Sequence, residues 1–424
     1  MLIGFDASRA FGAQNTGTEN YSLNLLKALA KVDRKNHYRV YLRGIENPEF
    51  RIENLRKEYP KNFEFRVVKP HLLWTQIGLA LETWRAPVDV LFVPAHTLPI
   101  LRKRKFGIYN FKFTISNSPK CIVTIHDLGV EYLPQYHQFP QKYYIDLASR
   151  YAAKSADCLI AVSQATKHDL ERIYGIDAAK IKVIYEGVDK DFFKPQSKSK
   201  IDKVKKKYKI SGDYFLYVGT VQPRKNLMFL IDMFNTFVKC NSVKSNSTKY
   251  NKTDRKFSLI IAGKLGWDYN QIIQKGTGNV KFLGYVNRED LSALYSGAIS
   301  AVFPSLFEGF GLPILEALSS GCRVIASDIP VHRELFGALT RGYESIKRSE
   351  SGRKSGNPNH PEAMMLAKLN DERQWLGLLH QYSRYVYKRE SISPKSLITP
   401  NSFSWEKVAK DTLEVFNEVV SSKK

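Results

Sequence analysis

The chain reads Phe303-Pro304-Ser305-Leu306-Phe307-Glu308-Gly309-Phe310-Gly311-Leu312-Pro313-Ile314-Leu315-Glu316-Ala317 at the point where an apolar strand passes into a helix. The β-branched and aromatic residues 299–303 predict a buried strand that ends at Pro304, because proline cannot donate to a ladder. The two glycines of the run permit positive φ and a close approach of the backbone to a ligand. Glu308 is therefore expected just past the carboxyl end of a strand, the edge where open α/β sheets bind ligands.

Outward from this run, short β-rich segments alternate with segments of helical period in both halves of the chain. This alternation predicts βαβ units and parallel sheets. A chain of 424 residues exceeds one ordinary core, so we expect two α/β domains. The expected strands are residues 2–6, 38–42, 63–67, 88–93, 121–126, 157–162 and 181–185, then 214–219, 257–262, 280–283, 299–303 and 323–327.

The fold class we expect is therefore α/β, with two doubly wound, Rossmann-like domains that face an interdomain cleft. Such clefts favour ligand sites. Polar residues 341–360 are expected to form a mobile loop, followed by a helix at 361–385. The expected division is an N-terminal domain at 1–190, a polar linker at 191–212, a C-terminal domain at 213–400 and a final amphipathic helix at 401–424.

The chain is strongly basic, with a net charge of +24 and a pI of about 9.6. Much of the excess lies in three runs, which are either solvated loops or sites for anions. They lack the interleaved aromatic residues of a nucleic-acid platform, so no nucleic-acid partner is expected. An anionic membrane surface is the better functional interpretation for one of them. The three runs are Arg102-Lys103-Arg104-Lys105, residues 198–209 and residues 244–256, and the first is the membrane candidate.

Cysteine usage and hydropathy bear on location. The four cysteines lack metal-ligand spacing, which is typical of buried thiols in a reducing compartment. No charged and apolar leader opens the chain, and the apolar residues 72–86 are too short and too charged to span a bilayer. We therefore expect a cytoplasmic protein, with peripheral binding at the inner face of the cytoplasmic membrane as an option.

A second motif, Gly219-Thr220-Val221-Gln222-Pro223-Arg224-Lys225-Asn226, follows a strand and opens a helix. Two adjacent cations at a helix N-terminus favour negative charge, and a diphosphate fits. On its own, such a motif is more often a basic surface turn. Its meaning changes when the same domain also contains Glu308 and Glu316.

Together these motifs resemble the fourth family of GT-B fold glycosyltransferases (glycosyl transferases group 1), and specifically a mannosyltransferase-like subgroup. The resemblance covers most of residues 1–335. It rests on the glutamate run, on Pro223-Arg224-Lys225-Asn226 and on three further segments: Ile184-Tyr185-Glu186-Gly187-Val188-Asp189, Gly284-Tyr285-Val286 and Ala326-Ser327-Asp328-Ile329-Pro330-Val331-His332-Arg333-Glu334.

The resemblance implies roles for residues of the second domain. Glu316 would bind the ribose hydroxyls of a nucleotide, and Glu308 would lie by the donor sugar. Lys225 and Arg224 would stabilise the diphosphate as it leaves, a role that positive charge at that position suits. The remaining donor-binding residues implied there are Gly219, Phe310, Gly311 and Leu312.

In the first domain the resemblance points to three positions. His126 follows a buried strand and would lie near the transferred sugar, although a histidine at a strand end is more often structural. Ser163 either caps a helix or contacts a phosphate. Gly17, in Asn15-Thr16-Gly17-Thr18-Glu19, would belong to a glycine loop that approaches the donor. The final helix would cross back to the first domain.

The sequence also departs from the family pattern at two places. Many relatives have an arginine where this chain has Thr220, which leaves Lys225 and Arg224 to hold the phosphates and points to the Gly-Thr subgroup. Relatives also have a short apolar strand beyond residue 335, whereas residues 341–360 are polar here.

We expect a retaining hexosyltransferase that moves a hexose from a nucleotide diphosphate sugar to a saccharide or a lipid-linked saccharide. GDP-mannose is the favoured donor and a UDP-hexose the alternative. No cofactor and no metal are expected, because the lysine and arginine can neutralise the diphosphate. Two other classes remain open: an NDP-sugar epimerase or phosphorylase of the same fold, and an inactive GT-B protein that binds anionic membrane or nucleic acid.

Overall fold

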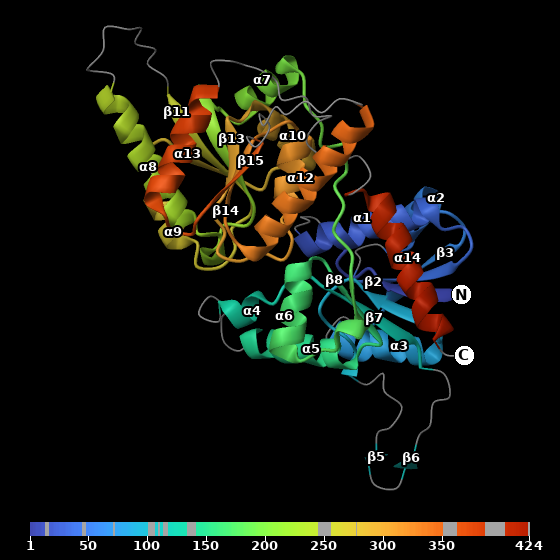
Figure 1. Cartoon of the computed structure of the whole chain (residues 1–424). Coiled ribbons are helices and arrows are strands. Elements are labelled where there is room, and N and C mark those ends of the chain that lie inside the picture. The colour runs from blue at the N-terminus through green and yellow to red at the C-terminus, as the bar shows by residue number, and fades with distance from the viewer. Residues whose placement is uncertain are drawn as a thin grey trace. The chain divides into compact units, whose positions relative to one another are not determined.

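The computed structural model describes residues 1–12, 17–44, 48–70, 73–100, 107–108, 111–112, 118–133, 141–244, 256–276, 278–350, 363–385 and 403–422. The chain divides into two compact units (Figure 1). Unit 1 comprises Met1–Gly187 with Trp405–Lys424, and unit 2 comprises Val188–Ser404. The basic run Arg102 to Lys105 lies outside the described residues.

Unit 1 is built on a seven-stranded sheet whose neighbouring strands all run parallel, in the order β3-β2-β1-β4-β7-β8-β9. A short antiparallel pair, β5 with β6, forms a separate small sheet. The elements of unit 1 are β1 (Leu2–Asp6), α1 (Gly17–Val32), β2 (His37–Arg43), α2 (Pro48–Glu58), β3 (Phe63–Val68), η1 (Trp74–Leu79), α3 (Ala80–Arg85), β4 (Val90–Val93), β5 (Gly107–Ile108), β6 (Phe111–Lys112), β7 (Lys120–Ile125), α4 (Gly129–Tyr132), α5 (Gln141–Ser155), β8 (Cys158–Ala161), α6 (Gln164–Tyr174), η4 (Ala178–Lys180), β9 (Ile181–Val183) and α14 (Trp405–Ser421).

Unit 2 has a six-stranded parallel sheet in the order β12-β11-β10-β13-β14-β15. In Figure 1, α8, α9 and α13 lie on one side of this sheet and α7, α10 and α12 on the other. The elements of unit 2 are α7 (Lys198–Lys207), β10 (Asp213–Val218), η5 (Pro223–Lys225), α8 (Leu227–Lys244), β11 (Phe257–Ala262), α9 (Asn270–Lys275), β12 (Val280–Gly284), α10 (Arg288–Gly297), β13 (Ser300–Phe303), α11 (Leu312–Ser319), β14 (Val324–Ser327), α12 (Pro330–Glu350), β15 (Met364–Ala367) and α13 (Glu372–Tyr385).

Both sheets have the strand order of a doubly wound fold, which confirms the expected fold class. In each, the order reverses beside the first strand, so that β1 lies between β2 and β4, and β10 lies between β11 and β13. The central strands are apolar on both faces because helices cover both. For example, all four residues are buried in β4, β8, β13 and β14.

Every strand expected from the sequence has a counterpart, but the expectation for the polar region after residue 340 was wrong. The helix α12 continues to Glu350 where a loop was expected, and β15 follows at Met364–Ala367 where the sequence suggested helix. This strand pairs with β14 and completes the sheet edge. Its residues Met-Met-Leu-Ala lack β-branched side chains, which removed the usual strand signal.

Residues 191–212, for which a linker was expected, include helix α7 of unit 2. The side chain of Gln196, just before α7, donates to Ser292 Oγ on α10 at 3.1 Å. Lys207 and Tyr208, at the end of α7, both bond Asp290 on α10. The lysine-rich sequence is therefore one exposed face of a helix that packs on α10.

The helix α14 belongs to unit 1, although more than 200 residues of unit 2 precede it. It lies beside α1, as Figure 1 shows. Trp405 meets the ring of Tyr21 with centroids 5.8 Å apart, and Phe416 meets Phe92 of β4 at 5.2 Å. The apolar stripe of α14 thus completes the core of unit 1.

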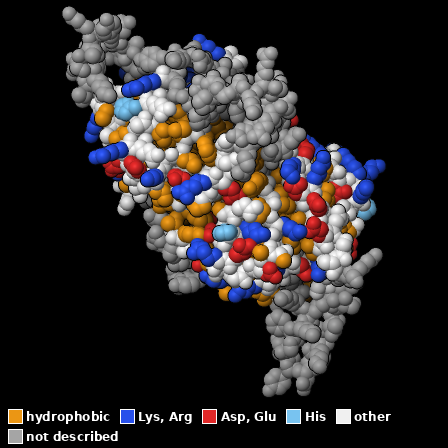
Figure 2. All heavy atoms as spheres, viewed as in Figure 1, with side chains coloured by type: hydrophobic (Ala, Val, Ile, Leu, Met, Phe, Trp, Pro, Cys, Tyr) orange, Lys and Arg blue, Asp and Glu red, His pale blue; other side chains and the backbone are white. Residues whose placement is uncertain are grey.

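Surface charge is mixed on the face that Figure 2 shows, where lysine and arginine side chains are interspersed with acidic ones. Across the described ranges, no helix combines the length and the apolar character that crossing a bilayer requires.

Candidate active site

The strongest candidate site in unit 2 lies at the carboxyl ends of two neighbouring strands, β10 and β13. After β10 the chain turns at Gly219 and forms the short helix η5, which contains Arg224 and Lys225. After β13 the loop 304–311 carries Glu308 and leads into α11. These two strands flank the point where the strand order reverses, which is the usual ligand edge of this fold.

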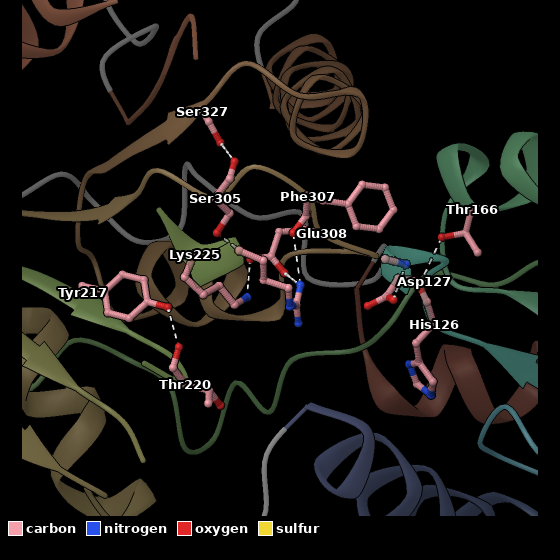
Figure 3. Close-up of polar contacts among 12 residues, drawn as sticks. His126, Asp127, Thr166, Tyr217, Thr220, Lys225, Ser305, Phe307, Glu308 and Ser327 are labelled. Carbon is pink, nitrogen blue, oxygen red and sulfur yellow. Dashed lines mark hydrogen bonds and ion pairs between the residues drawn. The ribbon is translucent and has the colours of Figure 1, made fainter. Parts of the chain in front are cut away.

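The structure brings the predicted cations and the first predicted glutamate together, and Figure 3 shows the contact of Lys225 with Glu308. The ammonium of Lys225 donates to Glu308 Oε1, and the guanidinium of Arg224 lies 3.5 Å from Glu308 Oε2. All three side chains are largely buried. The triad contains two cations and one carboxylate and so carries a net positive charge, which suits it to an anionic ligand.

Two hydrogen bonds tie the loop after β13 to the turn after β10. The main-chain N–H of Leu306 donates to the carbonyl of Arg224 at 3.0 Å. The guanidinium of Arg224 donates to the carbonyl of Phe307 at 3.1 Å. Segments about 80 residues apart in the sequence are therefore held in one rigid cluster.

The electrostatics of the triad favour an ionised carboxylate. Burial by itself raises the pKa of Glu308, but the charges of Lys225 and Arg224 and the hydrogen bonds of Lys225 and Ser305 outweigh it, so the pKa falls to about 2. Burial, together with the negative charge of Glu308, raises the pKa of Tyr217 well above its usual value. Glu308 is thus a fixed anion and cannot serve as a general acid near neutral pH.

A chain of hydrogen bonds through Ser305, Ser327 and His332 fixes the carboxylate of Glu308. Ser305 Oγ donates to Glu308 Oε1 at 2.7 Å, and Ser327 Oγ donates to the carbonyl of Ser305 at 2.5 Å. His332 Nδ1 donates in turn to the carbonyl of Ser327 at 2.8 Å. Burial lowers the pKa of His332 and keeps its ring neutral. The site analysis of the sequence missed these supports, although all three residues lie in the motifs that carried the resemblance.

Gly219 is required by close packing of backbone and side chain. Its φ is 151°, and a Cβ there would meet Tyr217 Oη at 2.7 Å. Gly263, after the neighbouring strand β11, is closer still, since its Cβ would lie 1.9 Å from the carbonyl oxygen of Gly219. The floor of the site is therefore built from backbone.

The other predicted donor residues lie at the start of α11. Gly311 has φ 109° and precedes the first helical residue, Leu312. Phe310 is buried with its ring 6.2 Å from that of Phe403. Glu316 is also buried and accepts a long hydrogen bond, 3.4 Å, from Tyr295 of α10. The ribose-binding role of Glu316 remains a prediction.

In unit 1, the predicted His126 directly follows β7 and is held at both ring nitrogens. Nδ1 lies 3.1 Å from Glu186 Oε1, and Nε2 lies 3.1 Å from the carbonyl of Pro94, the residue that follows β4. The histidine and the glutamate are 8% and 5% exposed. No local pattern pairs Glu186 with a histidine 60 residues away, although both residues lie in the quoted segments.

Ser163 caps α6, as one of its two interpretations expects. Its Oγ accepts from the N–H of Thr166 at 3.0 Å, and Thr166 Oγ1 donates to the carbonyl of His126 at 3.2 Å (Figure 3). A role of Ser163 at a phosphate remains a prediction. Gly17 is the first residue of α1, with open space where a Cβ would lie. Of the predicted glycine loop, Thr18 and Glu19 also belong to α1, whereas Asn15 and Thr16 fall outside the described residues.

Comparison with known proteins agrees with this geometry. The family model for glycosyltransferase family 4 matches residues 15–192, and that for glycosyl transferases group 1 matches residues 198–348. O-antigen chain mannosyltransferase B of Escherichia coli is 27% identical over 344 residues, which covers 77% of this chain and 80% of that protein. O-antigen chain mannosyltransferase RfbU of Salmonella typhimurium is 28% identical over 399 residues, which covers 91% of this chain and 96% of that protein.

Solved structures with low sequence identity share the fold. Sucrose-phosphate synthase from Thermosynechococcus elongatus superposes with a TM-score of 0.68 at 17% identity, covering 99% of both chains. WaaG, described as a glycosyltransferase of lipopolysaccharide biosynthesis, has a TM-score of 0.61 at 15% identity and covers 100% of this chain and 98% of its own.

Two doubly wound units, with paired cations and a glutamate at a sheet edge, define a GT-B glycosyltransferase, and the enzyme is a hexosyltransferase. Two glycosyltransferase models, glycosyltransferase family 4 and glycosyl transferases group 1, together match most of the length of the chain.

Proposed function

We propose that this enzyme is a retaining mannosyltransferase that transfers mannose from GDP-mannose to a saccharide or lipid-linked saccharide during synthesis of a cell-surface polysaccharide. The observation that carries the proposal is the buried Lys225, Arg224 and Glu308 triad, in a chain that resembles two O-antigen mannosyltransferases over most of its length. Thr220, directly after Gly219, adds support through its likeness to the Gly-Thr subgroup.

The residues divide the work as follows. Lys225 and Arg224 take the charge that grows on the diphosphate as the glycosidic bond breaks. Their present partner, Glu308, is held by Ser305, so its carboxylate stays in place to orient sugar hydroxyls. Glu316, on α11, accepts hydrogen bonds from the ribose hydroxyls of the nucleotide.

The proposals on stereochemistry and on metal use are supported by the same side chains. None of these side chains is set up as a covalent nucleophile, since Glu308 is fully engaged as an ion-pair partner. We therefore favour reaction on one face of the sugar, in which the departing phosphate accepts the acceptor proton. The positive charge of Lys225 and Arg224 makes a metal unnecessary for this step.

A UDP-hexose is the alternative donor. One fold neighbour, HepE from Anabaena, has been solved with UDP and glucose and has a TM-score of 0.64 at 17% identity. At that identity only the fold is shared, and the mannosyltransferase relatives weigh more heavily. The acceptor proposal places the enzyme at the cytoplasmic membrane face, with Arg102, Lys103, Arg104 and Lys105 toward anionic lipid.

The test is transfer itself. Purified full-length enzyme would be given GDP-mannose, UDP-glucose or UDP-galactose with a panel of synthetic saccharides and lipid-linked saccharides. We expect GDP release that depends on both mannose donor and acceptor, and an α-linked product from the α-linked donor by NMR. Preferential release of UDP would overturn the donor assignment, and a product of inverted configuration would overturn the retaining assignment. Lys198→Ala, an exposed lysine on α7, is the matched control for Lys225→Ala.

A further inference from the structure

His126 and Glu186 form a buried pair of titratable groups. Neither the family models nor the triad of unit 2 assigns a function to this pair. His126 directly follows β7, and Glu186 stands just before the point where the chain leaves unit 1. Two segments 60 residues apart thus meet at the carboxyl edge of the sheet, where this fold places its ligands.

The two hydrogen-bond partners of the His126 ring determine which of its nitrogens carry a proton. The carbonyl of Pro94 can only accept, so Nε2 must carry a hydrogen. An ionised Glu186 also only accepts, so Nδ1 must carry one as well. A neutral imidazole has a single N–H and would leave one buried acceptor facing a lone pair, which costs about 1–3 kcal/mol. Imidazole is more basic than a carboxylate, which places the shared proton on the ring.

Two titratable side chains that contact the His126 ring, Tyr21 and His96, stay uncharged and so do not compete with Glu186 as its charged partner. Tyr21 of α1 meets the His126 ring edge-on, with centroids 4.7 Å apart, and burial raises its pKa, so it stays a neutral phenol. The ring of His96 lies 5.6 Å away, and burial together with the charge of His126 lowers its pKa to about 4. Among the described residues, the charged groups Asp127 and Arg9 also interact with His96.

We propose that Glu186 is a positioning residue that fixes the His126 ring and keeps it doubly protonated. Both N–H groups then donate within unit 1, to Glu186 and to the carbonyl of Pro94, and the ring serves the transferred sugar as a cation held in one orientation. The catalytic part of this inference rests on the proposed function, since it assumes that His126 serves sugar transfer. The protonation part stands on the geometry of unit 1 alone.

Two variants separate charge from shape. Glu186→Gln keeps the size of the side chain, and its amide N–H can donate to a bare Nδ1, so the ring becomes neutral in the same place. Glu186→Ala removes both the charge and the contact. Glu171→Gln, on a partly exposed helix position of the same unit, is the matched control because its described side-chain partners are Lys167 and His168.

The first readout needs no substrate. Nitrogen NMR of enzyme labelled in its histidine rings, with His126→Asn for assignment, should show both His126 nitrogens protonated at pH 7 in the native enzyme. We expect Glu186→Gln to retain a protonated Nε2 and to lose the proton on Nδ1, with Glu171→Gln unchanged. A native ring with a single protonated nitrogen would overturn the inference without reliance on any variant.

The second readout is kinetic. We expect Glu186→Gln to lower kcat by about 10- to 100-fold, the range that one charged hydrogen bond allows, with a smaller change in KM for the donor. Glu186→Asp should recover part of the loss. Normal kcat in Glu186→Gln, with the nitrogen spectrum changed as expected, would overturn the positioning role. Absence of sugar transfer in the native enzyme would instead count against the proposed function.

Discussion

The main-chain N–H of Leu306 donates to the carbonyl of Arg224, so the loop after β13 is fastened to the turn after β10 at the residue beside Lys225. The ion pair of Lys225 with Glu308 is therefore supported by backbone as well as by charge. An altered side chain in this cluster should change chemistry while the two loops stay joined.

Replacement of Lys225 by alanine should lower kcat/KM by about 100- to 1,000-fold, because a charge aimed at the leaving group contributes most in the transition state. Lys225→Arg should recover part of the activity. Steady-state assays of nucleotide release measure both. Activity of Lys225→Ala equal to that of Lys198→Ala would contradict the assignment.

Because of Glu308, the free energy of unfolding of unit 2 should decrease as the pH falls. Its pKa in the folded protein is about 2, below its usual 4.5, so its contribution is complete above pH 4.5 and is lost as the pH falls toward 2. The shift corresponds to about 3 kcal/mol. Unfolding of native enzyme and Glu308→Gln, compared by denaturant titration between pH 6 and pH 2.5, should show a stability difference that shrinks with acid. A difference that does not vary with pH would refute this linkage.

Ser163→Ala should cost about 1 kcal/mol of stability, because the N-cap of α6 is lost. Ser163→Thr keeps a hydroxyl at the cap and should restore most of it. If Ser163 also contacts a phosphate, the alanine variant should show a raised KM for the donor beyond the change in Ser197→Ala, which removes the cap of α7. An unchanged KM would limit Ser163 to its capping role.

Phe416→Ala should destabilise unit 1 by about 3–5 kcal/mol, the usual cost of removing a buried phenylalanine. Asn417→Ala, one residue along on the exposed face of α14, should cost little. Hydrogen exchange can follow each unit by its own peptides, and we expect faster exchange in β1 and β4 with β10 and β13 unaffected. Equal acceleration in both sheets would contradict the division into units.

Activity should survive removal of divalent cations by EDTA, because Lys225 and Arg224 supply positive charge to the diphosphate. Among the described residues, no cluster of three histidine, cysteine or acidic side chains could hold a metal ion. Loss of activity in EDTA that magnesium or manganese restores would show that the two cations do not suffice.

The position of a strand could be predicted from the sequence where its own side chains show whether it is buried or exposed. Buried strands such as β13 are apolar on both faces and bounded by proline or glycine, so their positions could be inferred. The strand β15 could not, because its place depends on pairing with β14. In the site, Lys225 and Glu308 were recognised by type and motif. The contact of Glu186 with His126 depends on chain crossings that no local pattern encodes.

The packing of α14 against α1 also has a consequence for biosynthesis. During translation, residues 1–187 emerge first but lack the helix that covers Tyr21 and Phe92. Unit 2, which is contiguous in sequence, can fold while that apolar face is still open. The first unit to leave the ribosome is therefore the last to be completed, and its exposed face is where a chaperone would be needed.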